Sequence, residues 1–198
     1  FEMSFEIIDI PDGDLTFSRT WRESESVDWM ERLRKEIEWE QHRIKIFGQW
    51  VDCPRLSAWY GDPGAMYSYS SLSLTPKAWT PTLLEVRNQL AETIERPFNS
   101  VLLNLYRNGN DSMGWHSDDE WELGLNPVIA SISLGGSRMM KFRHRSDSEV
   151  SNFVLELSPG SLLIMAGTTQ KFWQQEIPKT KKSVGERLNL TFRFVQCR

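Results

Sequence analysis

The stretch Val128-Ile-Ala-Ser-Ile-Ser-Leu134-Gly-Gly-Ser-Arg-Met139-Met-Lys-Phe-Arg-His144 carries two short runs of strand-forming residues on either side of a glycine pair. Glycine pairs are typical of turns, so the stretch predicts two consecutive strands, Val128–Leu134 and Met139–His144. Further short strands are expected around them, separated by Gly, Pro and Asn: Ser100–Tyr106, Asn152–Leu157, Ser161–Met165, Phe172–Ile177 and Arg187–Val195. Strands of this length and spacing favour a sandwich or barrel of the jelly-roll type.

Two amphipathic helices are expected before these strands. Apolar residues recur at helical spacing in Ser24–Ile37, along a stripe that begins at Val27, and again in Thr82–Glu95. The expected fold class is therefore mostly β with flanking helices (α+β): a double-stranded β-helix, or jelly roll, whose N-terminal helices brace one sheet. We expect one domain over residues 3–198 with its jelly-roll core at 98–195, and we expect residues 1–2, which precede a methionine, to be a remnant of cloning.

Composition and charge argue against a membrane-spanning chain and against a chain that is basic throughout. Of the 198 residues, 39% are apolar and 25% are charged, as in ordinary globular proteins. The net charge of -4 gives no general attraction for a phosphate backbone. Basic residues concentrate late in the chain, where they fit a local basic face and a scattered solvated surface equally well. No apolar run approaches the roughly 20 residues of a membrane span. We expect no membrane association, a monomer, and a location in the cytoplasm or in association with the nucleoid or nucleus.

The sequence His116-Ser117-Asp118 is a candidate metal-binding pair. Side chains two residues apart on an extended segment point to the same side, so an imidazole and a carboxylate would converge. They would supply two of the three ligands of a facial triad, which holds Fe(II) and leaves positions open for a co-substrate and oxygen. Such a pair is also common in solvated polar turns. The strand at the end of the chain strengthens the metal hypothesis, because it could place Arg187, Asn189 and Arg193 on one face.

Four segments match a known pattern, in the same order along the chain: Pro54–Ser70, Asn104–Glu120, Gly167–Lys179 and Arg187–Arg193. Together they resemble the AlkB family of Fe(II)- and 2-oxoglutarate-dependent dioxygenases, and the resemblance covers most of the chain. It implies Fe(II), 2-oxoglutarate as co-substrate and O2, and a jelly roll that holds them between its two sheets. It also implies that His116 and Asp118 bind the iron and act in catalysis.

Gln175 departs from the pattern of this family. The resemblance implies a histidine there as the third iron ligand, and a carboxamide offers only a weak carbonyl oxygen in place of an imidazole nitrogen. Weaker iron binding is therefore expected, with the Gln175 position facing the metal from the sheet opposite His116. His144 offers no substitute, since it is expected to be a surface strand residue. Whether Gln175 is natural or engineered stays open.

The resemblance implies a clamp for 2-oxoglutarate. Its members are two arginines and three hydrogen-bonding residues: Asn104, Tyr106, Arg187, Asn189 and Arg193. The planar fork of an arginine suits a buried carboxylate better than a lysine does. Two arginines on one strand face also make little structural sense without an anion between them. Asn104 and Tyr106 could equally be ordinary strand residues.

The substrate side resembles the nucleic-acid repair members of the family. The residues implied in substrate binding are Tyr60, Tyr67, Tyr69, Ser70, Asp119 and Glu120. Aromatic faces receive a base that has been flipped out of a duplex, and carboxylates favour a cationic N-methylated base. Core packing explains the tyrosines, and a solvated acidic turn explains the carboxylates, almost as well.

Three functions follow as alternatives. The first is oxidative demethylation of N-alkylated bases in DNA or RNA, in which the methyl group leaves as formaldehyde. Gln175 would either impair this activity or be tolerated. The second is a weak or inactive relative that binds nucleic acid or 2-oxoglutarate without turnover. The third is a dioxygenase that acts on a protein or small molecule. The retained arginines favour the first alternative over the second, and the tyrosine segment favours it over the third.

Overall fold

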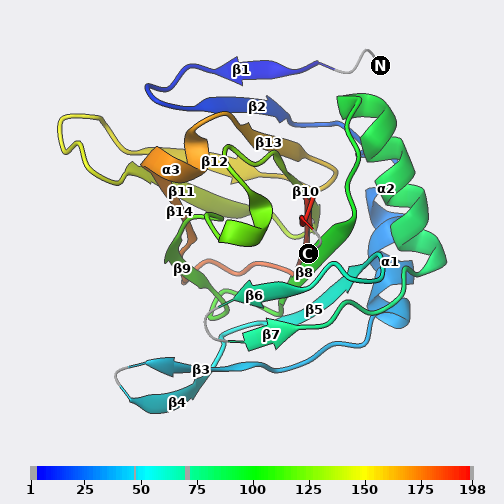
Figure 1. Cartoon of the computed structure of the whole chain (residues 1–198). Coiled ribbons are helices and arrows are strands. Elements are labelled where there is room, and N and C mark those ends of the chain that lie inside the picture. The colour runs from blue at the N-terminus through cyan, green and yellow to red at the C-terminus, as the bar shows by residue number, and fades with distance from the viewer. Residues whose placement is uncertain (1–3, 47, 70–71, 197–198) are drawn as a thin grey trace.

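The computed structural model describes residues 4–46, 48–69 and 72–196, with only the backbone described for 46, 67–69 and 72–73. Its largest element is an antiparallel sheet of seven strands in the order β1-β2-β13-β10-β15-β8-β5 (Figure 1). The strands are β1 (Glu6–Ile8), β2 (Asp14–Ser18), β5 (Leu56–Gly61), β8 (Ser100–Tyr106), β10 (Ile129–Gly135), β13 (Leu162–Ala166) and β15 (Arg187–Arg193). In the central strands β8 and β15 every residue is buried, because other layers cover both faces of this sheet.

Two helices cover one face of the seven-stranded sheet: α1 (Ser26–Glu36) and α2 (Pro81–Ile94) (Figure 1). α2 begins where Thr80 accepts a hydrogen bond from the backbone N–H of Leu83 at 3.3 Å, with a proline in the first turn. It ends at Glu95, whose φ of 55° places it in the left-handed region. The apolar faces of the helices and the near face of the sheet form one hydrophobic core.

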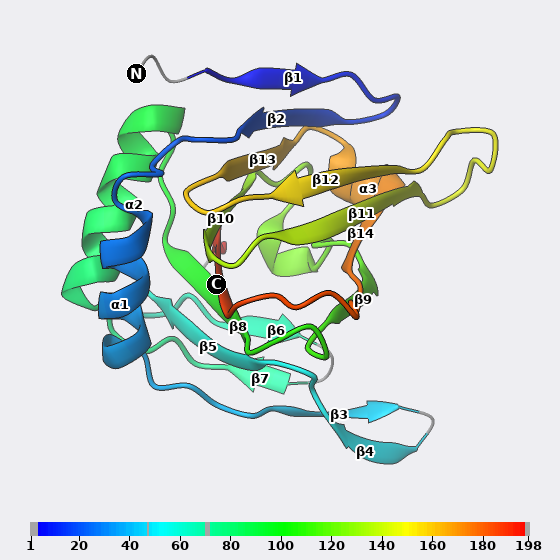
Figure 2. The same ribbon diagram turned by 180° about the vertical axis from the view of Figure 1, so that it is seen from behind.

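A second sheet of four strands packs against the other face, in the order β12-β11-β14-β9 (Figure 2). Its strands are β9 (Met113–His116), β11 (Arg138–His144), β12 (Phe153–Leu157) and β14 (Trp173–Ile177). A second hydrophobic core fills the space between the two sheets. The jelly roll with helices bracing one sheet is therefore confirmed.

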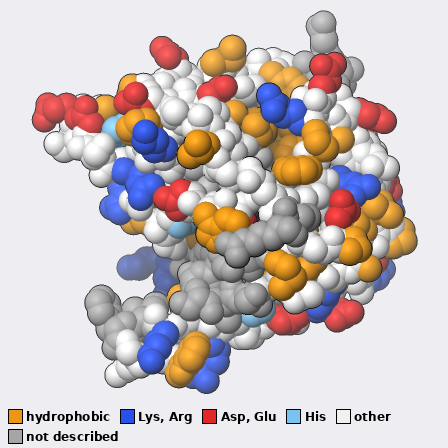
Figure 3. Space-filling model, viewed as in Figure 1, with side chains coloured by type: hydrophobic (Ala, Val, Ile, Leu, Met, Phe, Trp, Pro, Cys, Tyr) orange, Lys and Arg blue, Asp and Glu red, His pale blue; other side chains and the backbone are white. Residues whose placement is uncertain are grey.

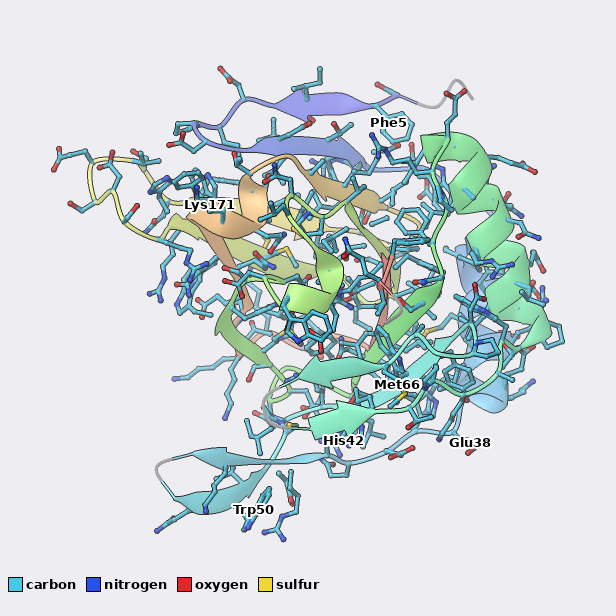
Figure 4. The ribbon with its side chains drawn as sticks, in the orientation of Figure 1. Phe5, Glu38, His42, Trp50, Met66 and Lys171 are labelled. Atoms are coloured by element: carbon cyan, nitrogen blue, oxygen red, sulfur yellow. The ribbon has the colours of Figure 1, made fainter. Side chains whose placement is uncertain are left out.

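Two small hairpins and two short helical turns complete the fold. The hairpins are β3 (Arg43–Ile46) with β4 (Gln49–Asp52), and β6 (Tyr67–Tyr69) with β7 (Leu72–Leu74). The turns are the 3-10 helix η1 (Trp121–Leu123) and α3 (Thr169–Phe172). The β3–β4 hairpin projects from the body, and Trp50 on it is 59% exposed (Figure 4).

Two expectations need correction. The stripe of α1 does not bury Val27, which is 66% exposed, because the helix turns Trp29 and Leu33 toward the sheet. The sheet also reaches beyond the expected core of residues 98–195, since β1, β2 and β5 extend it on both sides. Among the described residues, no helix is long and apolar enough to span a membrane.

Candidate metal and 2-oxoglutarate site

A narrow cavity of about 20 Å³, large enough for about one water molecule, lies between the two sheets. Strands of both sheets contribute to its lining, which consists of Asn104, Tyr106, Met113, His116, Asp118, Ser131, Met140, Met165, Gln175, Ile177, Asn189, Thr191 and Arg193. Seven of the residues singled out in the sequence are in this set, although they come from four separate strands and the segment after β9.

His116 lies at the end of β9, directly opposite Gln175 on the neighbouring strand β14. The expectation that Gln175 faces the metal from the opposite sheet is therefore wrong, because β9 and β14 pair within the four-stranded sheet. We call the part of the cavity around His116, Asp118 and Gln175 the corner. The seven-stranded sheet supplies other polar groups of the cavity, among them Arg193.

The ring of His116 is held in the tautomer that suits a metal ligand. Its Nδ1 lies 2.8 Å from the carbonyl oxygen of Gly114, and a carbonyl can only accept, so Nδ1 carries the proton. The lone pair of Nε2 is then left for a metal ion. Burial of the ring lowers the pKa of His116, and the nearby Asp118 carboxylate raises it by a smaller amount.

Asp118 is buried and anchored from two sides. Its Oδ1 accepts a hydrogen bond from Nη2 of Arg193 at 2.8 Å, and both side chains are almost fully buried. Its backbone N–H donates to Oε1 of Gln170 at 2.7 Å. Arg193 therefore balances the carboxylate charge and holds it beside His116.

Gln175 completes this corner with an amide. Its Nε2 donates to Oε1 of Gln170 at 3.2 Å, while its own Oε1 is buried and has no hydrogen-bond partner among the described residues. No group of three His, Cys, Asp or Glu side chains that could hold a metal occurs in the described part of the chain. The corner offers a divalent cation one imidazole nitrogen, one carboxylate and one amide oxygen, which is a weaker set than one with two imidazoles.

Arg187 lies at the far end of the same strand face as Arg193 and is fully buried. Its Nη2 donates to Oγ of Ser133 at 2.9 Å, and its guanidinium lies 5.2 Å from the ring centre of Tyr106. Its Nε and Nη1 have no hydrogen-bond partner in the described residues. Burial lowers the pKa of Arg187 to about 10. A buried cation with two unused donors fits the carboxylate of a ligand, as 2-oxoglutarate requires.

The two asparagines lie opposite each other on β8 and β15. Nδ2 of Asn189 donates to Oγ of Ser131 at 2.8 Å, and Oδ1 of Asn104 accepts from Nε of Arg55 at 2.9 Å. Sequence reasoning missed Ser131, Arg55 and Gln170. Ser131 carried a usable signal, a polar residue in a buried apolar strand, whereas the contacts of Arg55 and Gln170 join segments far apart in the chain.

A larger hollow of about 510 Å³ lies beside the cavity, and His116 lines both. The hollow is lined by Ile44, Pro54, Arg55, Gly114, Trp115, His116, Ser117, Asp119, Glu120, Arg145 and Gln174, and we call this set the mouth. Oδ2 of Asp119 pairs with Nη1 of Arg145 at 2.6 Å, at the exposed rim. Figure 3 shows the molecule hollowed beside the projecting hairpin, with Lys and Arg side chains above and below the hollow.

The residues expected to bind the substrate lie in different parts of the structure. The structure brings Asp119 and Glu120 to the mouth. It does not bring Tyr60 there, because alternate residues of β5 face opposite sides and Tyr60 packs in the core under the helices. Tyr67 and Tyr69 lie on β6, but their side chains are outside the described residues, as is the whole of Ser70.

Several known proteins are similar to this chain. A model of the 2OG-Fe(II) oxygenase superfamily matches residues 13–193. The alpha-ketoglutarate-dependent dioxygenase alkB homolog 3 of Bos taurus is 39% identical over 198 residues, 95% of this chain and 63% of that protein. The DNA oxidative demethylase ALKBH2 of Homo sapiens is 37% identical over 191 residues, 92% of this chain and 73% of that protein. The chain thus spans less than two thirds of the bovine relative.

A solved structure of OsALKBH1 has the same fold. It superposes with a TM-score of 0.64 at 15% identity, and covers 96% of this chain and 100% of that one. At this identity the likeness concerns the fold alone.

Proposed function

Since the chain belongs to the AlkB family within the 2OG-Fe(II) oxygenase superfamily, we propose that it removes N-alkyl groups from bases in DNA or RNA. Two relatives named above are a 2-oxoglutarate-dependent dioxygenase and a DNA oxidative demethylase. The observation that carries the proposal is Arg187, a fully buried guanidinium with two unused donors. It lies 5.2 Å from the ring centre of Tyr106, which lines the same cavity as His116 and Asp118.

When bound, Fe(II) and 2-oxoglutarate supply the oxidation of the alkyl carbon with O2. The residues of the chain bind and orient them. Arg187 would hold the distal carboxylate of 2-oxoglutarate, while His116 and Asp118 would hold the metal at the other end. Arg193 keeps Asp118 in place, and the buried apolar walls of the cavity, such as Met113 and Ile177, exclude water.

The mouth supports a base as substrate. A hollow of about 510 Å³ has room for a flipped base, and Trp115 offers an aromatic ring on its wall. N-alkylation at a ring nitrogen makes some bases cationic, and Asp119 and Glu120 at the mouth would favour that charge. Arg145 at the rim would contact the phosphate backbone.

The test is a turnover assay with Fe(II), 2-oxoglutarate and an oligonucleotide that bears one N-methylated base. Formaldehyde and the unmodified oligonucleotide are measured together, by derivatisation and mass spectrometry. We expect both products in equal amounts, and neither from Arg187→Met. Decarboxylation of 2-oxoglutarate without demethylation of any oligonucleotide would favour a protein or small molecule as substrate.

One observation favours a second candidate function. The amide of Gln175 stands where a stronger ligand is expected, so the chain could bind 2-oxoglutarate and nucleic acid without turnover. If this candidate is correct, the oligonucleotide and 2-oxoglutarate bind with normal affinity in calorimetry, and no formaldehyde forms even with saturating Fe(II).

A further inference from the structure

We propose that Gln175 is a metal ligand through its amide oxygen, and that Gln170 is the residue that fixes the amide in this orientation. The proposal rests on the metal site of the proposed function and deepens it, because it assigns a role to Gln170 and an atom to Gln175. It follows from a chain of three hydrogen-bonding groups, each of which settles the orientation of the next.

This series of hydrogen bonds begins at the backbone N–H of Asp118, which can only donate. It points at the side chain of Gln170 with a donor–acceptor distance of 2.7 Å, so the atom facing it must be the amide oxygen. The amide nitrogen of Gln170 then lies 3.3 Å from the sulfur of Met165. Gln170 is 1% exposed, so no exchange with bulk water offsets a wrong orientation.

The same oxygen of Gln170 also faces Gln175. Nε2 of Gln175 lies 3.2 Å from it, and a reversed amide would place two carbonyl oxygens against each other. The nitrogen of Gln175 is therefore held on the side of Gln170, and the oxygen is turned toward the remaining side.

His116 and Asp118 are the candidate partners of that oxygen. The three residues line one cavity, and Gln175 lies directly opposite His116 in the strand pairing. Oε1 of Gln175 is buried without a hydrogen-bond partner among the described residues, which is costly for a carbonyl unless something binds it. A divalent cation shared with the imidazole and the carboxylate satisfies that oxygen.

The proposed ligand set, one nitrogen and two oxygens, has a chemical consequence. Carboxylate and carbonyl oxygens suit Mn²⁺ and Mg²⁺, whereas imidazoles suit Fe, Ni, Cu and Zn. The site should therefore discriminate less strongly against Mn²⁺ than a site with two imidazoles would.

The experiment measures Mn²⁺ binding to the whole chain by electron paramagnetic resonance, with 2-oxoglutarate absent. Gln170→Met keeps the volume of the side chain and removes the acceptor oxygen, and we expect the affinity to fall by about 10- to 100-fold, as when an outer-shell contact is lost. Gln175→Met should lower it by a similar or larger factor. Gln89→Met is the matched control, because Gln89 is also a glutamine acceptor, from Nε of Arg22 at 2.7 Å, and lies on α2, on the helix-covered side of the seven-stranded sheet. It should leave the affinity unchanged.

The double variant separates this role from a structural one. If Gln170 acts through Gln175, Gln170→Met should have no further effect in the Gln175→Met background. Additive losses would mean that Gln170 acts through Asp118 or the fold, and would overturn the proposal. Gln170→Glu retains the acceptor oxygen and serves if Gln170→Met does not fold. It should bind Mn²⁺ at least as well as the parent, and a loss there would also overturn it.

Binding of Mn²⁺ is read without substrate or turnover. If Mn²⁺ affinity depends on Gln170 and Gln175 as expected but no demethylation is seen, the result would count against the proposed function alone. Equal Mn²⁺ affinity in the parent and Gln175→Met would count against the ligand assignment alone.

Discussion

In the proposed metal site, Gln175 would decide which metal ions are favoured. Its amide oxygen would take the place of a nitrogen donor, while His116 keeps its own Nε2 free because Nδ1 is committed to Gly114. The substitution Gln175→His should therefore raise the affinity for Fe²⁺ and Ni²⁺ more than that for Mn²⁺, since imidazole suits the first two. Anaerobic titrations with each metal measure this ratio. An equal gain for all three ions, or none, would show that residue 175 does not contact the metal.

The buried charge of Arg187 is expected to destabilise the ligand-free protein. Its guanidinium is fully buried, and its Nε and Nη1 have no hydrogen-bond partner among the described residues. Arg187→Met should leave the free energy of unfolding without ligand unchanged or higher, because an uncompensated buried cation is removed. Binding of 2-oxoglutarate should weaken by about 100-fold or more, as for a broken buried pair.

Thermal unfolding checks both effects of Arg187→Met. At a ligand concentration of about 100 times the Kd, 2-oxoglutarate should stabilise the parent by about 2.7 kcal/mol and the variant hardly at all. Equal stabilisation of the two proteins would remove Arg187 from the clamp.

Among the single site residues, the sequence predicted those whose role follows from their spacing along the chain. His116 and Asp118, two residues apart, line the same cavity, and Asn189 and Arg193 share a strand face because they are four residues apart on β15. Tyr60 was expected to bind the substrate and instead packs in the core, because the sequence alone does not show which residues of β5 face the helices. Gln170 could not be found, because its role depends on contacts with the end of β9 and with β14.

Among the elements, long periodic segments were predicted well. The strands expected at Ser100–Tyr106 and Met139–His144 match β8 and β11 within one residue, and the two helices match within two residues at each end. The pairing of β14 with β9 was missed, since sequence patterns show that a strand exists and not which strand lies beside it. β1 and β2 were missed as well; they extend the sheet at one edge and are too short to show a clear period.

The turn between β8 and β9 positions His116, and Asp111 holds that turn together. Its carboxylate accepts from the backbone N–H, Nε and Nη2 of Arg107, at 2.9, 2.8 and 2.9 Å. Asp111→Asn should destabilise the protein by about 1–3 kcal/mol, because charge-assisted hydrogen bonds in a buried position are lost. Denaturant unfolding at neutral pH measures the difference.

The same pair predicts a pH dependence. Burial alone would raise the pKa of Asp111, but the hydrogen bonds and charge of Arg107 outweigh it and lower the pKa below the ordinary 3.8. A carboxylate with a lowered pKa stabilises the fold above its unfolded pKa and loses this contribution as the pH falls through its folded pKa. The advantage of the parent over Asp111→Asn should therefore be constant near neutrality and shrink below about pH 3.8. A difference that stays constant under acid conditions would contradict the role of the charge.

For the whole molecule, charge opposes its proposed partner. The net charge is -4, so the chain as a whole repels a phosphate backbone, and attraction must come from local basic residues. Arg145 is one of these at the mouth, where Arg143 also lies 4.3 Å from the ring centre of Trp115. Binding should therefore be sensitive to single cations at the mouth and insensitive to those elsewhere.

Arg145→Ala tests this with a matched control. Arg145 pairs with Asp119 at 2.6 Å and is 38% exposed, while Arg34 on α1 pairs with Glu186 at 3.0 Å and is 41% exposed. If Arg145 contacts one phosphate, Arg145→Ala should weaken oligonucleotide binding and reduce the slope of log K against log salt by about 0.7 for a single strand or 0.9 for a duplex. Arg34→Ala removes the same charge beyond the seven-stranded sheet and should change neither quantity. Fluorescence anisotropy at four or more salt concentrations gives both slopes. Equal slopes for the two variants would place the nucleic acid away from the mouth, and with it the substrate of the enzyme.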